Sequence, residues 1–558
     1  MNDPSHSWKF WVFRSLIIFT IAMGVTLQCV SVSKQMGRLA NVPNYDDCTY
    51  MLSASLLDAK WKQGDLLGAF HTLKHSPYSV GLAAAAFAIL GNQDSAPYHA
   101  NIVVVVAYLA ALTWLLRGVP FFPWLVSLLI LVNLPIVKMG VVEFRPDIFW
   151  AVCTGFGAIY VLVSPELLKN RGEALFSGLI FTAAYLAKPT TFALTTIVLF
   201  ASFGGRFMHA WFFQHVQKIN LSDIWRSTAI VGSALVILAG WYYVCFGDYI
   251  WHYFYDNSFG VNQSIWSFKG NWIDSITYYL KGSAAKSSMG TLGALIFLLT
   301  VALSNWKLAT ASAMEITRFV LLCGICFLIY AINTLGMKSQ FLGASMYMLI
   351  IFIGADLLNC FYLRYRDVLR AKQAMTGSLV VLAFATALFF REWPPYSDWS
   401  EKSGKAAPYF REATLDFVKV LRSMNPRPKT ILFTQSGPVI PETVGIQMLR
   451  HRENLINYQS ASFVHTIDDF RQMQKTADMI VVPAMDTNGM TRHLPIQMII
   501  PDILKDLASD PEFHLYQTIF LTEGGSIYIY VRPAPTSAPF VGSRSGFISS
   551  FPSPLVLR

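Results

Sequence analysis

Long apolar runs separated by short polar connections occupy most of the chain up to residue 391. The first run follows Lys9 and Arg14, continues to about Val30, and has no A-x-A cleavage site after it. A run of roughly 17 to 25 apolar residues is long enough for a helix to cross the hydrocarbon core of a membrane. The pattern therefore predicts about eleven spans, the others lying near 99–116, 120–137, 147–163, 173–187, 189–205, 228–246, 290–304, 318–336, 340–361 and 375–391.

The composition is that of a membrane protein. The chain has 54% hydrophobic and 14% charged residues and a mean hydropathy of +0.44, whereas soluble domains carry about 25% charged residues. The net charge of +10 does not indicate a nucleic-acid partner, because the Lys and Arg residues gather in short loops between apolar runs. The seven cysteines all precede residue 361, so no disulfide framework is predicted.

The distribution of basic residues predicts the orientation of the spans. With the N-terminus inside, most loop Lys and Arg residues fall in the cytoplasm, as the positive-inside rule requires. The 31–98 loop, the 247–289 loop and the C-terminal region then lie on the outer face. Four cations are exceptions because they fall in short outer connections: Lys138, Arg145, Lys188 and Lys338.

The first outer loop, 31–98, contains two expected helices. Residues 47–62 have the spacing of an amphipathic helix, and Tyr78 to Gly91 form an Ala-rich apolar run. A run of about fourteen residues is too short to span a bilayer. We expect both helices to lie on the outer membrane surface or to re-enter the bilayer.

Asp46 and Asp47 stand side by side at the start of the first of these helices. A carboxylate close to hydrocarbon is costly unless water, a metal ion or a partner compensates it, so such groups often mark chemistry. The alternative is structural, since an Asp at a helix start caps the helix and favours its dipole. The pair is the leading candidate for catalysis.

The outer cations form a second group of candidates. Lys188 interrupts an apolar run before Pro189, where the chain forms either two short helices or one broken helix, and Lys338 lies at the mouth of a later span. Binding of a phosphate explains cations on this face; the alternative is snorkelling to lipid headgroups. Arg145 and Asp147 form either an ion pair at a helix start or a further part of the site.

The 247–289 loop is rich in aromatic residues, which either stack on a sugar or form the interfacial belt of a membrane protein; the belt is the favoured interpretation. His252 and Asp256 are four residues apart and are candidates to share a divalent metal ion with Asp46 or Asp47. Whether the protein uses a metal is left open.

Beyond Trp393 the pattern changes to short apolar strands alternating with amphipathic stretches, at 430–434, 442–451, 467–474, 479–482, 496–507, 515–521 and 526–531. This predicts a soluble α/β domain at 393–532, outside the cytoplasm, that recognises an acceptor or shields the active site. The tail at 533–558 is rich in Pro, Ser and Gly and is predicted to be disordered.

The order of these motifs resembles the GT-C superfamily of integral-membrane glycosyltransferases, in particular the branch of the protein O-mannosyltransferases and lipid A aminoarabinose transferases. That branch shows Asp-Glu-x-x-Tyr in its first outer loop and Lys-Pro-Pro-Leu or His-Pro-Pro-Leu before the short apolar helix. This chain has Asp47 in place of Glu and Ser76-Pro77-Tyr78 in place of Pro-Pro-Leu. The resemblance covers roughly residues 10 to 390 and rests on Asp46-Asp47-x-x-Tyr50, Gly64-Asp65, His75-Ser76-Pro77-Tyr78, Leu90-Gly91, Arg145-Pro146-Asp147 and Lys188-Pro189.

The resemblance implies a polytopic helical fold of residues 1–392 and a polyprenyl-phosphate sugar as donor. By position, Asp46 is the general base for the acceptor hydroxyl, with Asp47 beside it. Cations hold the leaving phosphate, for which this chain offers Lys188, Lys338 and Arg145. Tyr50, His75 and Asp147 are further site candidates.

The predicted protein is a glycosyltransferase of the cytoplasmic (inner) membrane that moves a sugar from polyprenyl phosphate to a lipid, glycan or protein acceptor on the outer face. The alternative is a polytopic transporter of a lipid-linked or small anionic substrate. Ion-coupled transporters need acidic or His relays inside their spans, and here Asp356 is nearly alone and close to a cytoplasmic end.

Overall fold

The computed structural model describes residues 8–35, 46–164, 167, 170–217, 221–260, 262–263, 268, 270–281, 288–335, 341–365, 377–378, 381, 400–434, 439–451, 453, 455–484, 494–520 and 526–533; for Asp46 it describes the main chain alone. The chain forms two compact units. The helical unit comprises Met1–Ser31, Ser76–Ser79 and Pro97–Tyr396, and the sheet unit comprises Val32–His75, Val80–Ala96 and Ser397–Arg558. Each unit is described by itself.

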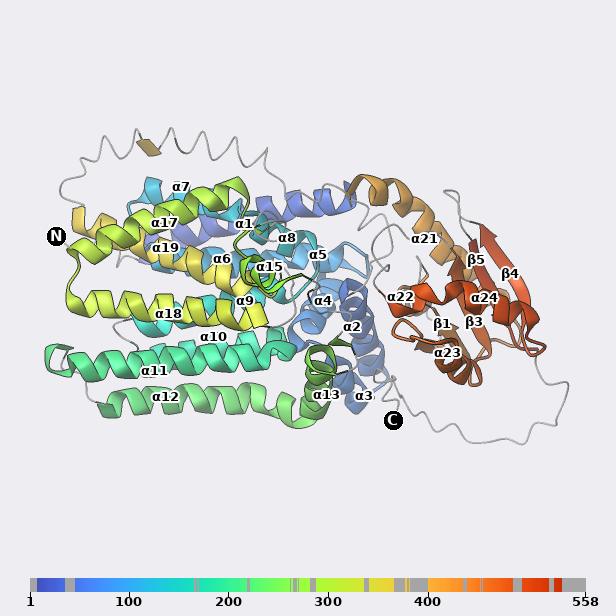
Figure 1. The fold of residues 1–558 in the computed structure, drawn as a ribbon. Helices are drawn as coiled ribbons and strands as arrows, with labels where there is room; N and C mark the ends of the chain where they lie inside the picture. The colour runs from blue at the N-terminus through green and yellow to red at the C-terminus, as the bar shows by residue number, and fades with distance from the viewer. Residues whose placement is uncertain are drawn as a thin grey trace. The chain divides into compact units, whose positions relative to one another are not determined.

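The described residues of the helical unit form helices almost throughout (Figure 1). They are α1 (Trp8–Gln35), α5 (Ala96–Ala100), α6 (Ile102–Leu115), α7 (Phe121–Val132), α8 (Pro135–Val142), α9 (Asp147–Val163), α10 (Arg171–Ala187), η3 (Pro189–Thr191), α11 (Phe192–Gln217), α12 (Leu221–Leu235), η4 (Val236–Gly240), α13 (Trp241–Ser258), α15 (Trp272–Thr277), α17 (Gly290–Thr310), α18 (Ala313–Leu335) and α19 (Ala344–Tyr365).

Seven helices of the described chain are long and apolar enough to cross a membrane, or eight if α7 and α8, which meet at a 60° bend, count as one span. The expected runs at 147–163 and 173–187 are helices of 17 residues, α9 and α10, and the run at 375–391 falls almost wholly outside the described residues. The polytopic helical fold is confirmed, and the number of eleven spans stays a prediction.

Helix α9 lies at the centre of the helical unit. It packs against α6, α8, α10, α11, α18 and α19, and every residue of it except Phe149 is buried. A helix that is apolar all round is covered either by other protein elements or by lipid, and here other helices cover it. This packing holds both ends of α9 in place within the helical unit.

Two local expectations are resolved. The chain forms two helices at Lys188, because α10 ends at Ala187 and η3 begins at Pro189. The aromatic segment 247–289 was predicted as a loop, and this prediction is wrong for residues 247–258. A π-helical turn, η4, is followed by α13, which continues as a helix to Ser258. Its aromatic residues lie at helical spacing, which the loop interpretation did not consider.

In the sheet unit, the first-loop segments form α2 (Asp46–Lys62), α3 (Leu66–His71), η2 (Thr72–Lys74) and most of α4 (Pro77–Leu90). The two helices expected at 47–62 and 78–91 are therefore confirmed as helices. Their placement relative to a membrane surface stays a prediction.

The C-terminal residues form a five-stranded sheet of order β2-β1-β3-β5-β4. Strands β2, β1 and β3 are parallel, and β5 and β4 add antiparallel. The strands are β1 (Thr430–Phe433), β2 (Asn457–Ser460), β3 (Met479–Ala484), β4 (His514–Phe520) and β5 (Ser526–Val531), and the helices are α21 (Ser400–Ser423), α22 (Pro441–Arg450), α23 (Ile467–Gln474), η5 (Pro495–Met498) and α24 (Ile500–Ser509).

Helices cover both faces of this sheet. Side chains alternate between faces along a strand, so Ile431 and Phe433 of β1 pack with α21 and α22, whereas Leu432 packs with α23 and α24. Strands buried on both faces read as continuous apolar runs, which is why the sequence pattern identified β1 and β3. The α/β architecture is confirmed; residues 534–558, predicted as a disordered tail, lie outside the described residues.

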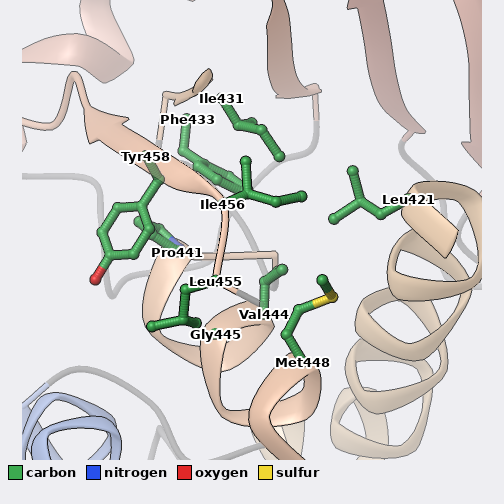
Figure 2. A pocket seen from close by; sticks show the side chains of 10 residues that line it. All are labelled: Leu421, Ile431, Phe433, Pro441, Val444, Gly445, Met448, Leu455, Ile456 and Tyr458. Atoms are coloured by element: carbon green, nitrogen blue, oxygen red, sulfur yellow. The ribbon is translucent and has the colours of Figure 1, made fainter. Parts of the chain in front are cut away.

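Helix α2 packs on α22 within the sheet unit. One face of α22 carries Val444 and Met448 toward β1 and α21, around a small apolar cavity (Figure 2). Beside this face, Gly445 receives Leu52 of α2: a Cβ at Gly445 would lie only 3.1 Å from Leu52 Cδ1. The absence of a side chain at Gly445 thus permits the close approach of the two helices.

The loop after α4 is bound to the same C-terminal helices. Asp94 is buried and forms ion pairs with Arg450 of α22 at 2.7 Å and with Arg411 of α21 at 3.6 Å. Arg450 Nε also donates to Asn92 Oδ1 at 3.4 Å. Breaking a buried pair leaves an uncompensated charge, so these contacts fix the first-loop segments on the α/β domain.

Candidate active site

Lys188 lies at the junction of α10 and η3. Pro189 disfavours the helical conformation for the residue before it, and Lys188 accordingly leaves the helix with φ −135° and ψ 81°. A cation at a helix C-terminus is favoured by the helix dipole. Its main-chain oxygen accepts a hydrogen bond from Thr191 Oγ1 at 2.7 Å, which fixes the turn.

Asp147 is the first residue of α9, where the helix dipole favours a negative charge. Its carboxylate joins two cations: Lys188 Nζ donates to Oδ1, and Arg145 Nε donates to Oδ2 at 3.2 Å. Arg145 also faces Glu143, with 3.6 Å between Nη1 and Oε2. The structure therefore brings three of the candidate residues, Arg145, Asp147 and Lys188, together and adds Glu143. The ion pair between Arg145 and Asp147, one of the two alternatives for these residues, is present.

Burial divides the four charged groups into a hidden acidic layer and an accessible basic edge. The side chains of Asp147 and Glu143 are 2% and 5% exposed, whereas those of Lys188 and Arg145 are 18% and 25% exposed. The cluster is formally neutral, but the cations are its accessible groups. The exposed parts of both cations can therefore be reached by an anionic ligand, and Lys188 has more N–H donors than its printed contact with Asp147 uses.

Aromatic rings support the two cations. Lys188 Nζ lies 5.8 Å from the ring centre of Trp150, and the Arg145 guanidinium lies 4.1 Å from that of Phe341, within the range of cation–π attraction. Trp150 is fully buried and donates to Thr195 Oγ1 at 2.9 Å. The cations are thus held from several sides.

The first-loop motif His75-Ser76-Pro77-Tyr78 contributes two anchors to the same helix ends. Ser76 Oγ donates to the carbonyl oxygen of Ala187 at 2.8 Å and accepts from the main-chain N–H of Ser79 at 3.1 Å. Ser before a Pro at the first position of a helix is a favourable cap. The Tyr78 ring stacks on that of Phe149, in the first turn of α9, at 4.1 Å.

The other predicted site residues belong to the sheet unit or fall outside the description. Asp46 and Asp47 begin α2, Asp47 is buried, and Tyr50 follows one turn later. His75 precedes α4, and its burial lowers the pKa of the imidazole to about 3, so it is a neutral group near pH 7. Lys338 lies outside the described residues.

The metal hypothesis gains no set of ligands from the described side chains, among which no three His, Cys, Asp or Glu groups lie close enough to hold an ion. His252 Nδ1 lies 3.3 Å from Asp248 Oδ1. Asp248 is one turn before His252, whereas Asp256, with which the sequence paired it, is one turn after it. The side chain of Asp46 is not among those described.

Sequence reasoning missed Glu143, Trp150 and the role of Ser76. Glu143-x-Arg145-x-Asp147 alternates acid, base and acid before a helix, and this alternation is the signal that identifies Glu143. The hydrogen bond of Ser76 joins residues 111 positions apart, and no local pattern indicates it.

The fold is similar to that of ArnT over nearly the whole chain. The crystal structure of ArnT from Cupriavidus metallidurans bound to undecaprenyl phosphate matches with a TM-score of 0.52 and 12% sequence identity, over 96% of this chain and 100% of that chain. The same protein in the apo state matches with a TM-score of 0.53 and 11% identity, over 95% and 99%. No protein-family model and no curated protein sequence matches the chain.

Proposed function

We propose that this protein transfers a sugar from a polyprenyl-phosphate donor to a lipid, glycan or protein acceptor. The observation that carries the proposal is the accessible basic edge formed by Lys188 and Arg145 over buried Asp147 and Glu143. The fold supports it, because the ArnT structure of the same fold holds undecaprenyl phosphate.

The proposed role of the basic edge is to bind the donor phosphate. When the bond between the anomeric carbon and the phosphate oxygen breaks, its electron pair stays on the phosphate, whose negative charge grows. Donors placed where charge develops stabilise the transition state more than the ground state. Lys188 and Arg145 shift part of their interaction from Asp147 and Glu143 to this oxygen.

The proposed base is Asp46, at the first position of α2. It takes the proton of the acceptor hydroxyl while that oxygen bonds to the anomeric carbon. Asp47, buried beside it, holds the start of the helix. If a metal ion takes part, transfer will be lost on EDTA treatment and restored by a divalent cation; if not, Asp47→Asn will be milder than Asp46→Asn.

The proposed location of the reaction is the outer face of the cytoplasmic membrane, which follows from the positive-inside rule. With the N-terminus inside and an odd number of spans, the α/β domain lies outside. A topology reporter fused after Arg532 tests this: activity only in the cytoplasm contradicts the assignment.

The direct test of the activity is to incubate purified protein with labelled polyprenyl-phosphate sugars and a membrane extract containing acceptors. We expect release of polyprenyl phosphate in step with sugar incorporation. A transporter reconstituted in liposomes would instead move the intact donor or a small anion across the bilayer without cleaving it. The GT-C fold does not favour that alternative.

A further inference from the structure

A second polar cluster lies at the other end of α9 from Asp147. It surrounds a cavity of about 70 Å³ whose charged lining comes from α17, α18 and α19, and whose apolar lining includes Val163, the last residue of α9. At 1.5 Å per residue the 17 residues of α9 place its two ends about 24 Å apart. This approaches the ~30 Å thickness of the hydrocarbon core, so the cavity belongs to the opposite membrane face.

Two of the four charged residues that line this cavity are buried. Asp356 and Lys307 are 8% and 7% exposed. No hydrogen bond or ion pair of Asp356 is found within the described residues, and Nε of Arg318 is buried without an acceptor. Lys307 Nζ donates to Cys360 Sγ at 3.2 Å, a weak acceptor. Buried charges require compensation, which a polar ligand in the cavity would provide.

The lining itself is balanced, with Lys307 and Arg318 against Glu315 and Asp356, but two further cations lie close to it. Arg206 donates to the carbonyl oxygens of Leu162 and Ser164 at 3.0 and 3.2 Å, at the same end of α9. Its positive charge and that of Arg318 repel each other. Arg117 adds a fourth cation that acts on Asp356. Of the two carboxylates, Glu315 already accepts from the N–H and hydroxyl of Ser312. The ligand of this cavity is therefore expected to carry negative charge.

Asp356 adds a second requirement. A carboxylate only accepts hydrogen bonds, so the ligand also needs an N–H or O–H donor close to its anionic group. Apolar Phe319 and Leu322 line the cavity, and the neighbouring Leu308 and Val320 are 45% and 54% exposed, as side chains that face lipid chains are. These features favour a lipid headgroup over a freely diffusing anion.

We propose that this cavity binds the headgroup of a phospholipid that carries a donor beside its phosphate, such as phosphoethanolamine or phosphoglycerol. Arg318 and Lys307 donate to the phosphate oxygens, and Asp356 accepts from the ammonium or hydroxyl group. By the positive-inside rule the lipid comes from the cytoplasmic leaflet. The site is independent of the proposed transferase site.

Native mass spectrometry of the purified full chain tests the proposal with lipids of identical acyl chains. Phosphatidylethanolamine and phosphatidylglycerol should bind about tenfold more tightly than phosphatidylcholine, whose headgroup has a phosphate but no N–H or O–H donor. The double variant Lys307→Met/Arg318→Met should lose about tenfold or more of this binding. Asp356→Leu should abolish the discrimination against phosphatidylcholine.

Arg364→Met is the matched control. Arg364 lies at the same end of α19, but its guanidinium donates to Thr310 O at 2.7 Å and it does not line the cavity, so lipid binding should be unchanged. If Asp356→Leu does not fold, Asp356→Asn, which removes the charge alone, should still reduce the discrimination. Equal binding of all three lipids, unaffected by the variants, would overturn the proposal and leave a cavity that holds water. Saturable binding of inorganic phosphate without lipid binding would overturn the lipid assignment.

Discussion

Ser76 donates its hydroxyl hydrogen to the main-chain oxygen of Ala187, 2.8 Å away and 111 residues further along the chain. Ala187 ends α10 and Lys188 follows it. The last carbonyl groups of a helix lack partners within it, and Ser76 supplies one. The first-loop motif is thereby tied to the residue before the candidate phosphate ligand.

The first prediction follows from this contact. Ser76→Ala removes the hydrogen bond to Ala187 and the cap of α4, each of which contributes about 1 kcal/mol to stability. We expect a modest fall in the thermal unfolding midpoint and a rise of several-fold in the KM for the donor, measured with saturating acceptor. Thr72→Ala is the control, since it removes a hydroxyl bond to Ala69 O in the same loop. Equal kinetics of the two variants would show that Ser76 has a structural role alone.

The second prediction concerns Lys188. Lys188→Met keeps the apolar stem but removes a charge-assisted contact to the leaving phosphate, and leaves Asp147 with Arg145 alone. We expect donor-dependent turnover to fall by about 10²-fold, with the KM for the acceptor almost unchanged. Lys62→Met, on a largely exposed cation paired with Asp58, should have little effect. Normal kinetics with a lower amount of protein in the membrane would make Lys188 a topology anchor.

The third prediction concerns the seat of α2 on α22. Gly445→Ala places a Cβ at 3.1 Å from Leu52 Cδ1, which a small movement of the flexible Leu52 side chain accommodates. Gly445→Leu does not fit and should displace α2, lowering turnover by about tenfold or more, since misplacement of about 1 Å costs as much as 10²-fold. Adding Leu52→Ala should restore part of the loss. A fully active Gly445→Leu variant would contradict a positioning role for α22.

The fourth prediction concerns acid stability. Burial lowers the pKa of His75 to about 3, against about 6.5 in an unfolded chain. Between these values the unfolded state binds a proton that the folded state does not, so this residue's contribution to stability is lost as the pH falls from 6.5 toward 3. His75→Gln should therefore reduce the drop in unfolding midpoint between pH 7 and pH 4. An unchanged drop would mean that His75 is protonated in the folded protein.

The sequence pattern was sufficient to predict those elements in which the order of apolar side chains follows directly from their burial. Strands β1 and β3 are apolar at successive positions because both faces of the sheet are covered. Strand β2 was missed because it is polar and partly exposed. Helix α21 was missed although Ala413, Phe417 and Leu421 recur every four residues and are buried, because the region is polar overall.

For the candidate site, the sequence identified the residues that depart from the positive-inside rule. Lys188 and Arg145 were found because they are cations where the positive-inside rule predicts few. Glu143 was missed because an acid next to Arg145 breaks no rule. The contacts of Ser76 and of Tyr78 with α9 and α10 depend on how distant segments pack, and a local pattern carries no record of that.

The most direct test of the account is cleavage of a labelled polyprenyl-phosphate sugar by purified wild type, Asp46→Asn and Asp58→Asn. Asp58 is an exposed carboxylate on the same helix, paired with Lys62, and serves as the matched control. We predict one polyprenyl phosphate released per sugar transferred by wild type and Asp58→Asn, and less than about a tenth of that rate for Asp46→Asn, with donor binding retained. Equal rates for wild type and Asp46→Asn would remove Asp46 from the base role, and no cleavage of any donor by wild type would contradict the proposed function.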